Sequence, residues 1–395
     1  MRKSFKLSIL FILLLLPFSF ICAAAENPED ENRQLLNEYT EFYGDIFENG
    51  LNGIENGNSF AEAAPELNIR SLMSALNSGE LAAQPRDVMN YIIKCLLGEV
   101  YSSARLMALI LALSVLSSYL GGFGGVARDS VSECAFYVCY IVIAGIASAA
   151  FYEAAQCTSS AVDNAAYFMR IVVPVMIAAL LTGGAVISAA SLEPALLTIV
   201  ELAVWVIDAV FVPAVMISAA LNIVNGLSDR FKTDRMVKLV NSAVKWGMSI
   251  MLTVFVSLAG LKSIASSGAD GLTLKLSKFA ASNLIPMVGG ILSESVETVM
   301  NCSALIKNTV GITGIICLGI IVMQPLLKLG AVLILFRVTA AIAEPVSDAK
   351  IIICVSRLSD SVAVLFSMLA AVTVMFIMVV TILINTGNSV MMFGR

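Results

Sequence analysis

The sequence predicts an all-α, polytopic membrane protein with about six to eight membrane segments, each long enough to cross a bilayer. Hydrophobic residues fill 58% of its 395 positions, and charged residues fill only 13%. Soluble domains carry roughly 25% charged residues, so this deficit already indicates a membrane protein. The mean hydropathy of +0.89 agrees with that assignment.

The first 25 residues have the three parts of a secretory signal peptide. Arg2, Lys3 and Lys6 form a basic start, an apolar stretch follows, and Ala23 to Ala25 supply a small-residue cleavage site. An uncleaved anchor is the alternative. In both cases residue 26 begins outside the cytoplasm.

Residues 26–100 are predicted to form a polar extracytoplasmic region. Acidic side chains crowd its start, and the net charge of −5 comes largely from this segment. No clustered basic surface of the kind that binds nucleic acid is evident. The remaining chain divides into first membrane helices at 101–160, membrane repeats at 165–265 and 277–385, and a short tail at 386–395.

Seven apolar runs and one weaker run are candidate membrane segments. The weaker run, Leu284 to Cys302, contains Glu294 and Glu297. The other seven are Leu106 to Val126, Ala135 to Ala155, Ile171 to Ala190, Leu196 to Val224, Trp246 to Ile264, Thr309 to Leu335 and Val362 to Ile384.

An internal repeat is indicated by proline spacing. Pro174 and Pro286 lie 112 positions apart, as do Pro213 and Pro325. A glycine pair follows the first proline of each half. Repeats with broken helices occur in transporter folds, so the predicted helix-break positions are Pro174, Gly183, Gly184, Pro213, Pro286, Gly289, Gly290 and Pro325.

The basic connectors distinguish two topologies. If every apolar run spans once, the connector Asn225 to Lys245, with five basic residues, lies outside and violates the positive-inside rule. If Ile171 to Ala190 and Leu284 to Cys302 are re-entrant, that connector becomes cytoplasmic together with Arg128, Arg337, Lys350 and Arg357. The second topology fits the charges better, and it implies a cavity or pore lining.

No residue pattern supports an enzyme, a cofactor or a metal site. The chain has no histidine, and its eight cysteines include no C-x-x-C pair. Small buried hydrophobes are the favoured interpretation of these cysteines over metal binding or disulfides.

Four charged residues in apolar surroundings are candidates for a pore or transport path: Asp208, Glu201, Lys328 and Arg337. A carboxylate within a membrane usually faces the bundle interior or water. The alternative places Glu201 near an interface and pairs Asp208 with Lys328 or Arg337, which are themselves candidates for interfacial helix ends.

The stretch ADGLTLKLSKFAASNLIPMVGGILSESVETVMNCSALIKNTVGITG, from Ala269 to Gly314, resembles the stage III sporulation protein AE family. The resemblance extends to the signal peptide, the polar region, the connector NGLSDRFKTDRMVKLVNSAVKWG and the last apolar run. It rests on segment pattern, and that family supplies no catalytic residues to transfer.

The resemblance implies a multi-pass protein of the mother-cell membrane around the forespore. It implies a channel-like, secretion-related complex with other stage III sporulation A-operon proteins and stage II sporulation protein Q. Such a complex supports late forespore gene expression. Membrane lipid and a homo-oligomer are the further expected partners. The alternative is a self-sufficient secondary transporter for a small solute.

Overall fold

The computed structural model describes residues 44–46, 85–122, 129–227, 233–284 and 289–394. These residues form helices and short turns, with no strand among them, so the all-α prediction is confirmed. The predicted signal peptide and most of the predicted polar region lie outside the described residues.

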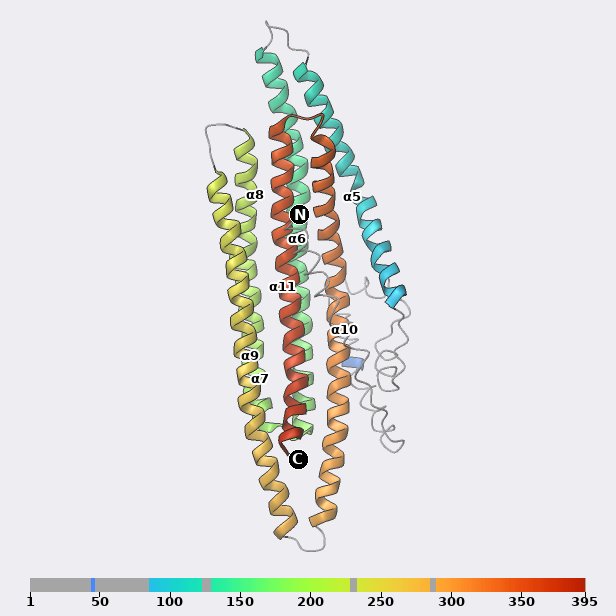
Figure 1. The fold of residues 1–395 in the computed structure, drawn as a ribbon, viewed down its shortest axis with the longest axis vertical. Helices are drawn as coiled ribbons and strands as arrows, with labels where there is room; N and C mark the ends of the chain where they lie inside the picture. The colour runs from blue at the N-terminus through green and yellow to red at the C-terminus, as the bar shows by residue number, and fades with distance from the viewer. Residues whose placement is uncertain (1–43, 47–84, 123–128, 228–232, 285–288, 395) are drawn as a thin grey trace.

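Six helical rods make up the described bundle (Figure 1). All six contain a segment long and apolar enough to cross a membrane, which is within the predicted range. One rod is formed by three consecutive elements, α7 (Val186–Val206), the π-helix η3 (Ile207–Phe211) and α8 (Val212–Leu227). The other rods are α5 (Pro85–Gly122), α6 (Asp129–Thr182), α9 (Asp234–Leu284), α10 (Gly289–Ala343) and α11 (Ala349–Gly394).

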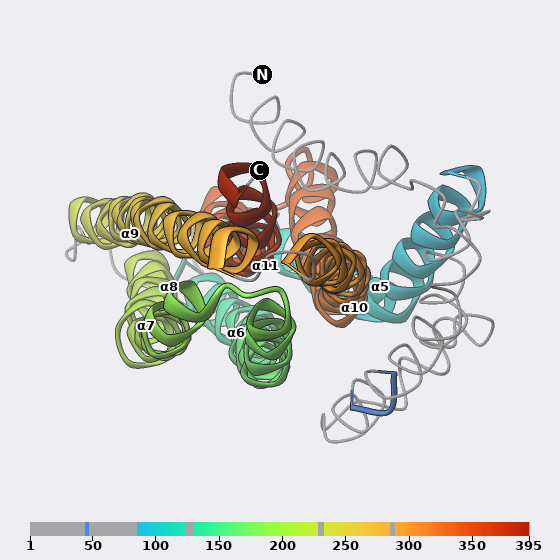
Figure 2. The same ribbon diagram turned by 90° about the horizontal axis from the view of Figure 1, so that it is seen from below.

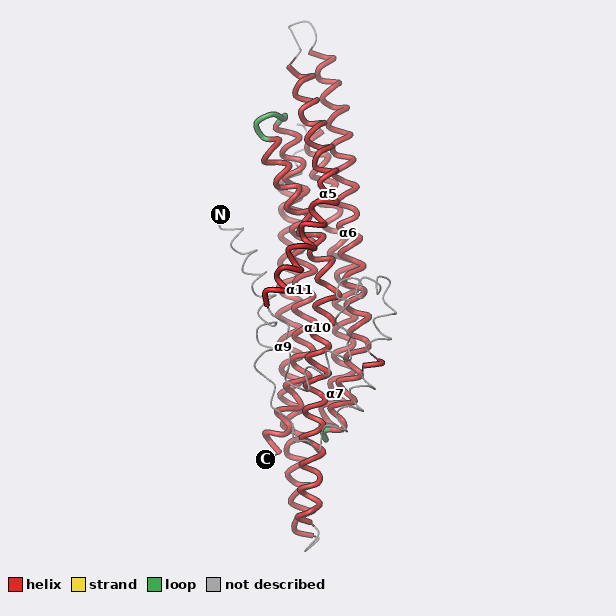
Figure 3. Tube along the Cα trace, turned by 90° about the vertical axis from the view of Figure 1, so that its right-hand side faces the viewer, coloured by secondary structure: helices red, strands yellow, loops and turns green. Residues whose placement is uncertain are grey.

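The rods run alternately up and down, as the colours along the chain show (Figure 1), and together they form one elongated bundle (Figure 3). Helix α11 packs against α10, α9, α6 and α8, and it has the largest buried share of its apolar window. Seen along the bundle axis, α5 and α9 lie at opposite edges (Figure 2). Their apolar windows are the least buried, so these two helices present the largest apolar surfaces to the surroundings.

The rods are much longer than a bilayer core is thick. Helix α6 has 54 residues and α10 has 55. At about 1.5 Å per residue each extends roughly 80 Å, against a hydrocarbon thickness of about 30 Å. The bundle therefore projects beyond the membrane.

The structure revises the bounds of the two segments predicted to be re-entrant. Helix α6 continues unbroken from the run Ala135 to Ala155 into Thr182, because no glycine or proline interrupts residues 156–170. The chain then reverses at Gly184, whose φ of 78° suits glycine, and α7 begins. The segment Leu284 to Cys302 likewise covers the end of α9 and the start of α10. Both segments are tips of long hairpins.

The helix order brings the described basic connectors to one end of the bundle. The junctions α5–α6, α8–α9 and α10–α11 lie at the top in Figure 1. Arg235, Arg337, Lys350 and Arg357 lie near these junctions. The topology with two re-entrant segments also placed basic connectors on one side. The structure groups these residues with six long helices instead.

The repeat offset maps helices onto helices. Shifting by 112 residues carries the α7–α8 rod onto α10 and α9 onto α11. Pro174 and Pro325 lie inside α6 and α10, which continue through them and are not broken there. Pro286 lies outside the described residues. Gly289 and Gly290 begin α10.

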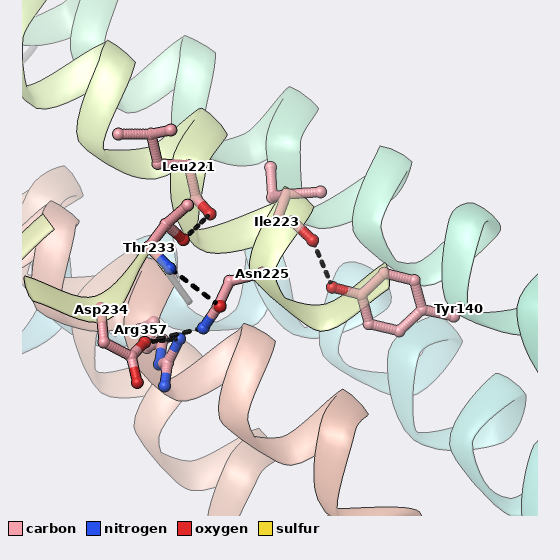
Figure 4. Close-up of polar contacts among 7 residues, drawn as sticks. All are labelled: Tyr140, Leu221, Ile223, Asn225, Thr233, Asp234 and Arg357. Carbon is pink, nitrogen blue, oxygen red and sulfur yellow. Dashed lines mark hydrogen bonds and ion pairs between the residues drawn. The ribbon is translucent and has the colours of Figure 1, made fainter. Parts of the chain in front are cut away.

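A polar network holds the α8–α9 junction against α6 and α11 (Figure 4). Asp234 accepts hydrogen bonds from Asn225 at 2.7 Å and from Arg357 of α11 at 2.6 Å. Tyr140 of α6 donates to the Ile223 carbonyl at 2.8 Å. Thr233 bonds to Asn225 and to the Leu221 carbonyl. The start of α9 is therefore fixed relative to both neighbours.

Candidate functional site

One exposed face of α6 is polar from end to end over five helical turns. It consists of Glu153, Gln156, Ser160, Asp163, Tyr167 and Arg170, all exposed, which we call the polar stripe. Their spacing alternates between three and four residues, which places them on one face of a helix. The opposite face is buried, with Ala154, Val162, Ala165 and Met169 among its residues.

An ion pair marks each end of the polar stripe. Lys328 of α10 donates to Glu153 at 2.7 Å. Arg170 forms a two-point pair with Glu201 of α7, whose second contact is 2.9 Å. The two α6 partners are 17 residues apart, or about 25 Å along the helix. This distance is close to the thickness of a hydrocarbon core.

The chain next to the polar stripe contains a π-turn. Pro213 has no N–H, and its ring crowds the preceding carbonyls of an α-helix. The helix widens before it, because the Val212 N–H donates to the Ile207 carbonyl, five residues back. The predicted break at Pro213 is thus a local widening within a continuous rod. Single π-turns occur frequently at functional sites, and this one carries Asp208.

Asp208 faces α6 near the middle of the polar stripe. It accepts a hydrogen bond from the Ser159 hydroxyl at 2.6 Å. The Asp163 carboxyl of the polar stripe lies close enough to Asp208 for the two groups to interact electrostatically. Glu201 lies two turns earlier on the same rod. The structure thus brings the candidates Asp208 and Glu201 to one face.

The candidates Lys328 and Arg337 do not contact Asp208. Lys328 binds Glu153 at the upper end of the polar stripe. Arg337 lies further toward the α10–α11 junction, with its nearest carboxylate oxygen, on Asp360, at 4.0 Å. The proposed pairing of Asp208 with either cation is therefore wrong, because α10 places both cations nearer the upper end of the bundle.

The described residues offer no metal centre. No group of three or more cysteine, aspartate or glutamate side chains gathers there in a geometry that could hold an ion. Cys139, Cys317 and Cys354 are buried, Cys157 is half-buried and Cys134 is exposed, and none of these five forms a disulfide.

A buried carboxylate supports the rod that carries Glu201 and Asp208. Asp270 of α9 accepts hydrogen bonds from the backbone N–H groups of Ile187 and Ser188, both at 2.8 Å. These N–H groups belong to the first turn of α7, which has no cap of its own. Asp270 thereby fixes the start of α7 to α9.

Sequence reasoning missed Glu153, Gln156, Ser160, Asp163 and Arg170. Glu153 lies in the predicted run Ala135 to Ala155, and the others fall between that run and Ile171 to Ala190, where no membrane segment was predicted. Their alternating spacing of three and four residues was the available signal, since it predicts one face of a continuous helix. Asp270 carried no comparable signal, because its partners are backbone groups 82 and 83 residues away.

Comparisons with known proteins agree with the resemblance in the sequence. The family model described as stage III sporulation protein AE matches residues 67–387. Stage III sporulation protein AE of Bacillus subtilis (strain 168) is 28% identical over 329 residues, covering 83% of this chain and 82% of the relative. No solved structure matches the chain.

Proposed function

Because the chain belongs to the stage III sporulation protein AE family, we propose that it is the membrane subunit of a channel-like, secretion-related complex needed for endospore formation. In this role it links mother cell and forespore and supports late forespore gene expression. It acts as a multi-pass protein of the mother-cell membrane around the forespore. No catalytic step is assigned to it.

The polar stripe is the observation that supports a channel role. Glu153, Asp163 and Arg170 are exposed on the surface of the single chain. A charged side chain at the centre of a lipid-facing helix costs about 2.5–3.5 kcal/mol on insertion scales. A face with Asp163 near its middle, and no exposed aliphatic side chain between its ends, is expected to face water or another protein chain. We infer that it lines an aqueous path.

The two ion pairs set the level of the membrane in this proposal. The Glu153–Lys328 pair and the Arg170–Glu201 pair lie near the two boundaries of the hydrocarbon layer, where charged side chains reach headgroups and water. Asp163 and Asp208 then lie inside the layer. The hydrogen bond from Ser159 to Asp208 gives the path a polar group close to its middle.

Cysteine accessibility tests the aqueous path directly. All eight native cysteines are first replaced, and single cysteines are then introduced at Gln156, Ser160 or Asp163. Matched controls are Ile250, Val254 and Leu258, exposed on α9 at about the same level. We expect a membrane-impermeant thiol reagent to label the α6 positions in membranes isolated from sporulating cells and to leave the α9 positions unlabelled. Equal labelling of both sets would contradict the aqueous path.

We propose that the partners are other stage III sporulation A-operon proteins and stage II sporulation protein Q. The polar region at 26–100 is the expected docking segment, since it follows the predicted signal. Deleting residues 30–90 should abolish co-purification with stage II sporulation protein Q from sporulating cells. Undiminished co-purification would show that docking uses the membrane helices.

The Asp163–Asp208 pair favours a secondary transporter as the second candidate, because carboxyl groups at membrane depth mark proton and ion paths. The variants Asp163→Asn and Asp208→Asn separate the two functions. A proton- or cation-coupled transporter should lose spore formation with either variant. A channel subunit should keep it, since asparagine preserves a polar path.

A further inference from the structure

The start of α9 carries a basic face that no contact with another described residue explains. Arg235, Lys238 and Lys245 are exposed there, together with Leu239 and Trp246. At 3.6 residues per turn these five positions fall within about one third of the helix circumference. The opposite side is buried through Val237, Val244 and Met248. We call Arg235, Lys238 and Lys245, with Trp246 beside them, the basic face.

The three cations of the basic face carry no ion pair with any described side chain. Other cations near the same end of the bundle are compensated differently. Lys328 pairs with Glu153, and Arg357 pairs with Asp234. Asp234, the acidic neighbour of Arg235, is therefore already occupied by Arg357 and Asn225 (Figure 4). The basic face is left as uncompensated positive charge.

The position of Trp246 relates the basic face to the lipid. Tryptophan prefers the membrane–water interface, and this side chain is 71% exposed. No charged residue occurs from Trp246 to Leu261, and Lys262 follows. Those 16 uncharged positions cover about 24 Å, which matches most of a hydrocarbon core. Lys245 therefore lies at the boundary, and Lys238 and Arg235 lie on its polar side.

We propose that the basic face binds anionic phospholipid headgroups in the leaflet at this end of the bundle. Lys245 is placed to contact a headgroup phosphate beside Trp246. Lys238 lies about 10 Å further along α9, within about one screening length of an anionic surface, and Arg235, about 15 Å along, lies where that field is weak. The basic connectors share this end, and positive connectors favour the cytoplasmic side, whose leaflet carries the anionic lipids.

The junction in Figure 4 explains why this surface can act as a rigid contact. Asp234 and Asn225 fix the first turn of α9, and Arg357 ties that turn to the central helix α11. The three cations are therefore held on one outward-facing surface. This proposal is independent of the polar stripe on α6, which lies on a different helix.

Fluorescence quenching of Trp246 in the full-length protein tests the proposal. The chain has two tryptophans, so Trp205→Phe leaves Trp246 as the reporter. The protein is placed in phosphatidylcholine vesicles that contain equal amounts of brominated phosphatidylglycerol or brominated phosphatidylcholine. We expect brominated phosphatidylglycerol to quench the fluorescence of Trp246 more strongly than brominated phosphatidylcholine does. Raising the salt concentration should reduce this difference.

Neutral variants separate the basic face from general surface charge. The triple variant Arg235→Gln, Lys238→Gln and Lys245→Gln should remove the preference, with the largest part, about fivefold, coming from Lys245 at the boundary. Lys275→Gln, an exposed lysine near the other end of α9, should retain it. Equal quenching by the two brominated lipids in the parent protein would overturn the proposal, as would an unchanged preference in the triple variant.

Discussion

Helices α6 and α9 present opposite chemistry at the same level of the bundle. Ser159 of α6 binds Asp208, and Gly247 of α9 packs on Phe211, three residues further along the same rod. Residues 153–170 of α6 and 245–262 of α9 therefore lie at about the same level along the bundle axis. The exposed residues of α6 there are polar or tyrosine. Between Lys245 and Lys262, the exposed residues of α9 are aliphatic, aromatic or hydroxyl-bearing, including Trp246, Ile250, Val254, Leu258 and Leu261.

The buried faces of the two helices are alike, so packing does not explain this difference. Ala161 and Val162 of α6 and Val244 and Phe255 of α9 are all apolar and buried. Only the outward faces differ. The comparison indicates that the surroundings of the bundle are not uniform, and we infer that α9 faces lipid and that α6 faces water or protein.

The largest expected effect comes from placing a charge on the α9 face. Val254→Asp puts a carboxylate on an exposed apolar position in the middle of the uncharged segment. We expect it to cost about 2.5–3.5 kcal/mol in membrane insertion and to reduce the membrane-inserted fraction strongly. Protease protection of the membrane fraction measures this.

Ser160→Asp on the polar stripe is the matched control for Val254→Asp. Ser160 is exposed on α6 at a similar depth, and a carboxylate facing water carries little insertion cost. Its inserted fraction should stay near that of the parent. If both variants lost insertion equally, the two faces would have the same surroundings.

The fold class followed from the sequence because a chain with few charges and long apolar runs has few ways to satisfy its backbone in lipid. Helix bounds were harder to obtain. The hydropathy minimum at residues 156–170 resembles a connector, yet it is the polar stripe of a continuous helix. An average hydropathy does not record the spacing of polar residues along the chain. That spacing is what distinguishes the polar face of a helix from a loop.

Only part of the candidate site was predictable. Asp208 and Glu201 were identified because a carboxylate in an apolar run is conspicuous on its own. Their neighbours depend on which helices meet, and no local pattern states that Arg170 faces Glu201 across 31 residues. The π-turn at Asp208 follows from Pro213 only once the rod is known to continue through it.

The next effect tests the junction that holds α6 and α9 in register. A Cβ at Gly226 would lie 2.0 Å from the Tyr140 hydroxyl oxygen and 2.6 Å from its ring carbon Cζ. Gly226→Ala should therefore displace Tyr140, break its bond to the Ile223 carbonyl, and destabilise the protein by about 1–3 kcal/mol. Thermal unfolding in detergent measures the loss.

Two further variants check that cause. Tyr140→Leu in the Gly226→Ala background should restore part of the stability by removing the clashing ring. Gly145→Ala on α6 has no atom within 4 Å of the new Cβ and should be neutral or mildly stabilising, because alanine favours helix over glycine. Equal destabilisation at both glycines would contradict the clash.

A smaller effect is expected at the cap that joins α9 to α7. Asp270→Ala removes both acceptors of the Ile187 and Ser188 N–H groups and should cost about 0.5–2 kcal/mol, the range for a lost helix cap. Asp270→Asn, which keeps one acceptor, should cost less. Thr273→Ala, exposed one turn away, should change the unfolding temperature little. An unfolding temperature unchanged by Asp270→Ala would show that water replaces the cap.

The smallest stability effect is the most informative about the surroundings of α6. Arg170 and Glu201 have side chains 48% and 49% exposed in the single chain. If water covers them, a double-mutant cycle with Arg170→Gln and Glu201→Gln should give a coupling below about 1 kcal/mol, as for other exposed ion pairs.

If lipid or a tightly packed second chain covers them, breaking the pair leaves one charge without water. The cost of each single variant should then reach about 3–5 kcal/mol. A weak coupling therefore supports an aqueous path along the polar stripe, whereas a strong one assigns the stripe to a dry interface.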